Sequence, residues 1–134
     1  MILHPKILLL SADDSTTRSI NSCLGQEEFT VVHSSRGMGA LELIHKEDPA
    51  MIILDIDLPD FNSLAIIRAL RAEQLHHRLP VILIGSTLTE EDVLIGLEVG
   101  ADLCLLESFH PQVFVARVRS LLRSSELAKP SSNF

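Results

Sequence analysis

Five short apolar runs punctuate the chain, and stretches with helical spacing separate them. The runs are KILLLSA (6–12), FTVVHSS (29–35), AMIILDI (50–56), PVILIGS (80–86) and DLCLLES (102–108). None alternates strictly between apolar and polar residues, which is typical of strands buried on both faces of a parallel sheet. The pattern therefore predicts an α/β fold: a doubly wound (βα)5 arrangement with right-handed crossovers and helices on both faces of one five-stranded sheet.

The stretches between the runs each carry one apolar stripe at helical spacing. The stripes are Ile20, Cys23 and Leu24; Met38, Leu41 and Ile44; Leu64, Ile67 and Leu70; Val93, Leu94 and Leu97; and Phe114, Val118 and Leu121. Side chains that cap helix N-termini stand before three of them, namely Asp14 or Ser15, Asn62 or Ser63, and Thr87 or Thr89. Gly25 and Gly100 lie where helix C-caps are expected.

The apolar periodicity ends near Ser124, where the chain continues as SSELAKPSSNF. Residues 1–123 are therefore expected to form one domain. Residues 124–134 are expected to form a linker or a disordered tail, which would lead to an output domain cut away from this chain.

Composition narrows the classes of partner. The 11 basic and 18 acidic residues give a formal charge of -7, which disfavours direct binding of this segment to nucleic acid or anionic lipid. No apolar run is long enough for a membrane span, and the N-terminus does not read as a signal peptide. Cys23 and Cys104 lie in apolar patterns and are predicted to be buried free thiols, which suits a reducing cytoplasm.

Acidic and hydroxyl residues follow the ends of the predicted strands. They are Asp13 and Asp14 after the first, Asp55 and Asp57 after the third, Gly85-Ser86-Thr87 after the fourth, and Glu107-Ser108 after the fifth. The carboxyl ends of parallel strands meet at one edge, where ligands bind in open α/β sheets. Two carboxylates about 4 Å apart repel by roughly 4 kcal/mol at an effective dielectric constant near 20, so the acids favour a cation. Mg2+, which prefers oxygen ligands, fits best.

Five stretches in register resemble the receiver domains of bacterial two-component response regulators over about residues 5–123. KILLLSADDSTTRSI is similar to the first strand, acid pair and first helix of that family, and MIILDIDLPD to its phosphoacceptor strand. RLPVILIGS, GLEVGADLCLLESF and VFVARVRSLLRSSEL resemble its fourth strand, fifth strand and last helix. The resemblance implies a flavodoxin-like fold and a signalling role rather than an enzymatic one.

The same resemblance implies a mechanism. Asp55 would accept a phosphoryl group from a histidine kinase or phosphotransfer protein. Asp13, Asp55 and the backbone carbonyl of Asp57 would hold Mg2+, while Asp14 fits a helix cap better than a metal ligand.

Several positions depart from the family pattern. Ala12 stands where the family has the first acid of its acid pair. If the alignment is shifted by one residue, Asp13-Asp14 form the pair. Gly85 replaces the hydroxyl residue that grips the phosphoryl group, for which Ser86 or Thr87 could substitute. Cys104 replaces an aromatic switch residue, and Glu107-Ser108 replaces a Lys-Pro pair.

Glu107 matters most among these departures. A lysine at this position would attract the phosphoryl group, whereas the glutamate repels it. The sequence therefore indicates an atypical receiver with a weakened pocket. Two alternatives remain for Glu107 at this stage: it turns outward into solvent, or it enlarges the cation site.

Two other functions compete with phosphoryl acceptance. A pseudo-receiver would keep the fold and act as a protein interaction module without phosphorylation. The Asp-Ile-Asp motif also resembles haloacid-dehalogenase-type phosphatases, which usually carry it on the first strand of a longer chain.

Two surface features complete the expectations. A homodimer through the fourth and fifth helices would set Arg117, Arg119 and Arg123 against the acidic residues 90–92. The six histidines show no metal-ligand spacing that converges on a strand end, and the pair His76-His77 is expected to be a solvated helix end.

Overall fold

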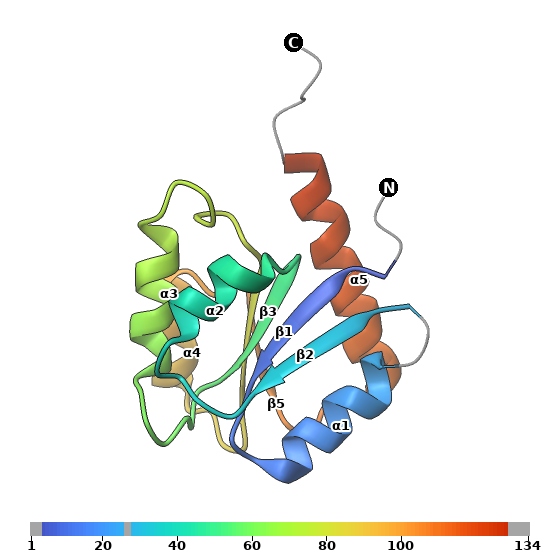
Figure 1. The fold of residues 1–134 in the computed structure, drawn as a ribbon. Helices are drawn as coiled ribbons and strands as arrows, with labels where there is room; N and C mark the ends of the chain where they lie inside the picture. The colour runs from blue at the N-terminus through green and yellow to red at the C-terminus, as the bar shows by residue number, and fades with distance from the viewer. Residues whose placement is uncertain (1–3, 26–27, 129–134) are drawn as a thin grey trace.

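The computed structural model describes residues 4–25 and 28–128, in which strands and helices alternate as predicted (Figure 1). The elements are β1 (Lys6–Leu10), α1 (Asp14–Leu24), β2 (Thr30–Ser34), α2 (Ala40–Glu47), β3 (Met51–Asp55), α3 (Ser63–Arg71), β4 (Val81–Gly85), α4 (Glu90–Val99), β5 (Leu103–Leu106) and α5 (Pro111–Ala128). All strand pairs are parallel, in the order β2-β1-β3-β4-β5. This confirms the doubly wound (βα)5 fold.

Helices cover both faces of the sheet, with α1 and α5 side by side on one face and α2, α3 and α4 on the other (Figure 1). Side chains of β1 alternate between the two cores: Leu8 and Leu10 join the core under α2 and α3, while Ile7 and Leu9 join the core under α1 and α5. Every residue of β3 and β4 is buried. The continuous apolar runs of these strands therefore reflect burial on both faces.

The strand order reverses at β1, which has β2 on one side and β3 on the other. In such sheets the connections after the two diverging strands leave on opposite faces, so a crevice opens beyond their carboxyl ends. The register pairs Leu10 with Leu54, which places the residues just after β1 beside Asp55. Topology thus brings these two segments together at the edge where the sequence placed its acids.

Most predicted helix boundaries are confirmed. The Asn62 side chain caps α3, and Thr89 caps α4 in a reciprocal capping box with Asp92. Gly25 and Gly100 follow α1 and α4 as C-caps. A left-handed φ of 125° at Gly100 is a conformation that side chains disfavour, which explains a glycine there.

The cap of α1 was predicted wrongly. Asp13 is the N-cap, rather than Asp14 or Ser15, and its Oδ1 accepts hydrogen bonds from the amides of Ser15 and Thr16. Asp13 has an extended backbone, whereas Asp14 already forms the first residue of the helix. The capping carboxylate therefore lies one residue earlier than the pattern indicated.

Two apolar stripes were also placed incorrectly. Met38 precedes α2 and is 65% exposed, and Leu94 and Leu97 on α4 are 58% and 48% exposed. On α4, the exposure of Leu94 and Leu97 is explained by Gly96, where an added Cβ would lie 2.9 Å from Leu83 Cδ2. The helix approaches the sheet through this glycine, and the leucines consequently face outward.

At the C-terminus, α5 continues past residue 123 to Ala128. The linker was expected to begin at residue 124, but Glu126, Leu127 and Ala128 are good helix formers that extend the helix beyond its apolar stripe. Residues 129–134 of the expected tail lie outside the described residues. Within residues 4–25 and 28–128, the helices include none that is long and apolar enough to cross a membrane.

Candidate functional site

Asp55 is the last residue of β3 and has only 5% of its surface exposed. Its Oδ2 accepts a hydrogen bond from the Ser11 hydroxyl at 2.9 Å, and its Oδ1 accepts one from the Asp57 amide at 2.9 Å. The Ser63 hydroxyl donates to the Asp55 carbonyl at 2.5 Å, which ties the strand end to the start of α3. The carboxylate is therefore held in a fixed orientation at the switch point of the sheet.

The electrostatic environment of Asp55 opposes its ionisation. Burial is the main cause that raises the pKa of the Asp55 carboxyl above its ordinary value. The hydrogen bonds from the Asp57 amide and the Ser11 hydroxyl act in the opposite direction, because they stabilise the charged form. The negative charges of Asp57 and Glu107 add to the upward shift. Asp55 is thus a buried carboxylate with like charges nearby and few partners to offset them.

Glu107 faces this edge of the sheet rather than solvent. It follows β5, is partly buried, and its Oε1 accepts a hydrogen bond from the hydroxyl of Thr16 in the first turn of α1. Thr16 is itself buried, with 2% of its surface exposed. The alternative in which Glu107 turns outward is therefore not the observed arrangement, and the side chain bridges from β5 towards α1.

The other predicted acids occupy different positions at the edge. Asp13 directs Oδ1 at the amides of α1, and Asp14 is an exposed residue of the first helical turn. Asp57 is exposed, and its Oδ2 accepts a hydrogen bond of 3.4 Å from the Ser86 hydroxyl. Within the described part of the chain, three acids of this edge do not converge closely enough to surround an ion by themselves.

Gly85 and the hydroxyls after it are arranged differently from the expectation. A Cβ added at Gly85 would lie 2.8 Å from Ile56 Cγ2 and 3.0 Å from Leu88 Cδ2, so apolar side chains occupy the space a hydroxyl residue would need. Ser86 is exposed and contacts Asp57 rather than Asp55, and Thr87 is exposed. The geometry shows a packing reason for glycine at this position.

Cys104 is partly buried and contributes to the core under α4. An added Cβ at Gly96 would lie 3.2 Å from the Cys104 sulfur, which shows how closely the helix passes over it. Burial raises the pKa of the Cys104 thiol, so the neutral form is favoured. Ala12 and Ser108 are both exposed.

Sequence reasoning missed two residues, Ser11 and Thr16. Ser11 is fully buried directly after β1, and its side chain contacts Asp55. Its signal was its place directly after the apolar residues of β1, where the strand register brings it beside the end of β3. Thr16 had no comparable signal, because its contact with Glu107 joins residues 91 positions apart.

The comparisons with known proteins agree with this geometry. The family model of the response regulator receiver domain matches residues 7–119. The alkaline phosphatase synthesis transcriptional regulatory protein PhoP of Bacillus subtilis (strain 168) is 32% identical over 130 residues, with 97% of this chain and 53% of that protein covered. The DNA-binding response regulator MtrA of Mycolicibacterium smegmatis is 32% identical over 124 residues, with 92% and 53% covered.

A solved structure shows the same similarity. The BeF3-activated N-terminal receiver domain of RstA from Klebsiella pneumoniae has a TM-score of 0.80 and 32% identity, with 88% of this chain and 98% of that chain covered. The chain spans about half the length of the curated relatives it matches. Fold, site and sequence similarity agree, and the chain belongs to the response regulator receiver domain family, whose members are signalling modules.

Proposed function

We propose that Asp55 accepts a phosphoryl group from a histidine kinase or a phosphotransfer protein. The observation that carries this proposal is the buried carboxylate at the switch point, oriented by the Ser11 hydroxyl and the Asp57 amide. A carboxylate oxygen attacks phosphorus, the bond from phosphorus to the donor histidine nitrogen breaks, and an acyl phosphate forms. The chain is modified once in this scheme, and no substrate is turned over.

Mg2+ is the cation that the donor set at this edge would take. The groups beside the Asp55 carboxylate include the oxygen donors of the Ser11 hydroxyl and the Asp57 carboxylate, and the family resemblance adds the Asp57 carbonyl. Mg2+ usually binds through one or two carboxylates and keeps several waters, so a closed ring of three acids is not required. We assign Asp13, Asp55 and the Asp57 carbonyl as ligands; the capping hydrogen bonds of α1 engage Oδ1 of Asp13. Bound Mg2+ would offset negative charge on the phosphoryl oxygens.

The pocket is a weakened one in this proposal because of Glu107. Burial is the main cause of the raised pKa of Asp55 and the charge of Glu107 adds to it, and a carboxylate in this place repels an incoming phosphoryl group. Gly85 supplies no hydroxyl, and the neighbouring Ser86 is directed at Asp57. Phosphoryl transfer is therefore expected to be slow and the product short-lived, compared with a receiver that has a lysine at this position.

The family also suggests a partner domain and a cellular location for this chain. MtrA is named a DNA-binding response regulator, and PhoP a transcriptional regulatory protein. We propose that a DNA-binding output domain acts with this chain in the whole protein, while residues 1–123 bind no nucleic acid directly. Cys23 and Cys104 are free thiols, but both are partly buried rather than buried as predicted. Free thiols suit a cytoplasmic location, which we propose for this chain.

The face formed by α4, β5 and α5 is the proposed contact for a second copy of the chain. Leu94, Leu97 and Leu106 are each about half exposed on α4 and β5, although large apolar side chains are normally buried. Arg119 was expected to contribute to this contact, but its guanidinium pairs with Glu28 of the same chain at 2.5 and 2.8 Å. Apolar contact between the α4 helices is therefore expected to contribute most to the proposed dimer.

The first test is intact-protein mass after incubation with acetyl phosphate and Mg2+. The parent chain is expected to gain one phosphoryl group and Asp55→Asn none, because only the buried carboxylate is positioned as nucleophile. Asp57→Asn retains the acceptor and its backbone carbonyl, and it should still gain the group. Absence of any gain in the parent, while a control receiver is modified, would instead support an interaction module that acts without phosphorylation.

The second test concerns Glu107. Glu107→Lys should accelerate phosphorylation of Asp55 by at least about tenfold, since a cation replaces an anion near the transferred group. Glu107→Gln removes the charge without adding one, and it should give an intermediate rate. The measurement is the initial rate of mass gain at fixed acetyl phosphate. If the lysine variant is no faster than the parent, Glu107 has no electrostatic role in the transfer.

The third test uses the stability of the protein. Because the pKa of Asp55 is raised on folding, this group favours the folded state below its ordinary pKa, and that contribution is lost as pH rises through the folded pKa. Without divalent cations, Asp55→Asn should therefore have a higher Tm than the parent at neutral pH. The difference should shrink as the pH falls and Asp55 is protonated.

Thermal unfolding followed by circular dichroism over a series of pH values provides the measurement. Asp14→Asn removes an exposed carboxylate of the same kind and is the matched control for the loss of one acidic side chain. A Tm for Asp55→Asn at or below that of the parent at neutral pH would contradict the destabilising role of the buried charge.

The fourth test is the oligomeric state. Phosphorylated parent protein is expected to form dimers in sedimentation velocity experiments, and Leu97→Glu should weaken dimerisation at least about tenfold by placing a charge in the apolar contact. The exposed Leu75, which lies in the connection after α3, offers a control in Leu75→Glu. Equal dimerisation of the two variants would exclude the α4 face as the contact.

A further inference from the structure

His76 was expected to be solvated, and this expectation was wrong. His76 lies in the connection between α3 and β4 and has only 8% of its surface exposed, whereas its neighbour His77 is exposed. The His76 ring turns inward because it reaches two acidic side chains: Nδ1 lies 3.2 Å from Glu73 Oε1, and Nε2 lies 3.4 Å from Asp48 Oδ1. A buried imidazole with carboxylates at both nitrogens needs a further explanation.

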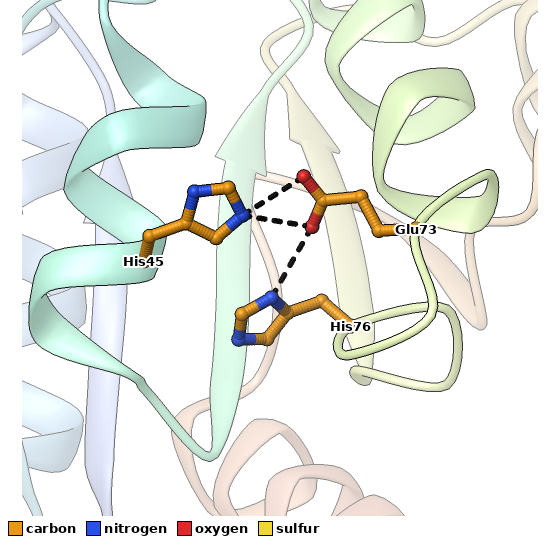
Figure 2. Close-up of side chains that lie close together, drawn as sticks. All are labelled: His45, Glu73 and His76. Carbon is orange, nitrogen blue, oxygen red and sulfur yellow. Dashed lines mark hydrogen bonds and ion pairs between the residues drawn. The ribbon is translucent and has the colours of Figure 1, made fainter.

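A second histidine completes the cluster (Figure 2). His45, in the last turn of α2, places Nε2 2.8 and 3.0 Å from the two oxygens of Glu73. Figure 2 shows both rings directed at the Glu73 carboxylate, one from α2 and one from the connection after α3. One ligand atom from each of the three residues lies within 4.8 Å of the other two. Within residues 4–25 and 28–128, this is the group that could surround a metal ion.

Two imidazole nitrogens and one carboxylate oxygen form a ligand set that Zn2+ favours, with water in the fourth position. Metal-ligand bonds of about 2.0–2.2 Å place neighbouring ligand atoms about 3.3 Å apart in a tetrahedral site. The nitrogen-oxygen distances of 2.8–3.2 Å are close to this spacing. Glu73 Oε1 lies 3.0 Å from His45 Nε2 and 3.2 Å from His76 Nδ1, so one carboxylate oxygen is near this spacing from both nitrogens.

Asp48 supplies the outer contact that ligating histidines usually have. A nitrogen that binds metal carries no proton, so the ring proton of His76 resides on Nε2 when Nδ1 is the ligand. That Nε2 faces Asp48 Oδ1, and a carboxylate in this place fixes the tautomer and orientation of the ring. Asp48 is held as the C-cap of α2, with φ at 46° and its amide bonded to the Ile44 carbonyl.

We propose that His45, Glu73 and His76 bind a divalent transition-metal ion of the zinc class. The cluster lies where the strands begin, between the end of α2 and the connection that enters β4, whereas Asp55 lies where β3 ends. The site is thus distinct from the acidic edge, and its nitrogen-rich ligands differ from the oxygen donors that suit Mg2+. A bound ion links α2 to the connection between α3 and β4.

The test is titration with Zn2+ and Co2+ in an excess of Mg2+, which occupies the acidic edge. The parent chain should bind one equivalent of either ion. Bound Co2+ should give the intense visible absorption of four-coordinate nitrogen and oxygen ligation, without a thiolate charge-transfer band. Zn2+ should also raise the Tm, since an ion that binds only the folded state stabilises it.

Three variants separate the cluster from other sites. His45→Asn changes an exposed side chain and should abolish the Co2+ absorption and the rise in Tm. His77→Asn is the matched control, because it removes the adjacent exposed histidine, and it should bind as the parent does. Asp48→Asn should weaken binding by about 10–100-fold, as expected for the loss of an outer partner.

Because His76 is buried, His76→Asn is informative only if its circular dichroism matches that of the parent; His45→Asn carries the test otherwise. Equal binding by parent and His45→Asn would overturn the proposal, as would a thiolate band or the absence of stoichiometric binding. Phosphorylation of Asp55 plays no part in these measurements, so their outcome is independent of the proposed phosphoryl transfer.

Discussion

Burial of the central strands on both faces is the constraint on which the rest of the molecule depends. β3 and β4 have no exposed residue, so helices must cover both sides of the sheet, and parallel pairing requires each connection to cross over it. The apolar contacts of β1 divide between two cores for the same reason. The reversal of strand order at β1 then opens the crevice that contains Asp55.

That crevice confines a negative charge at the end of an apolar strand. Ser11 and the Asp57 amide stabilise the Asp55 carboxylate, while burial, Asp57 and Glu107 oppose its ionisation. The balance of charges around Asp55 differs from that of a site with a cation beside the carboxylate. Here the acid Glu107 takes that place and accepts a hydrogen bond from Thr16. The buried Asp55 carboxylate therefore has the acid Glu107 near it, and this arrangement supports the weakened receiver that we propose.

The opposite end of the sheet shows how differently polar clusters can be built in one small fold. At the acidic edge, the donors are oxygens around a buried carboxylate. At the other end, one carboxylate lies between two imidazoles, and the inner ring is held by the cap of a helix. Oxygen and nitrogen donors select different cations. In the two sites that we propose, the ends of the sheet would therefore take different ions.

The sequence by itself determined the alternation of strands and helices, because periodicity and caps are local signals. It identified the acids at the strand ends, and the family match over residues 7–119 confirms that the chain is a receiver domain. Two of its errors were local: the cap at Asp13 and the end of α5 each differ from the pattern by a few residues.

Tertiary structure alone decided which side chains meet. Ser11 contacts Asp55 through the register of β1 with β3, and Thr16 contacts Glu107 across a separation of 91 residues. The outward leucines of α4 follow from the close approach at Gly96, and the burial of His76 follows from acids on two other segments. Such contacts join residues far apart in the chain, so periodicity, which reports only which face of an element is apolar, carries no information about them.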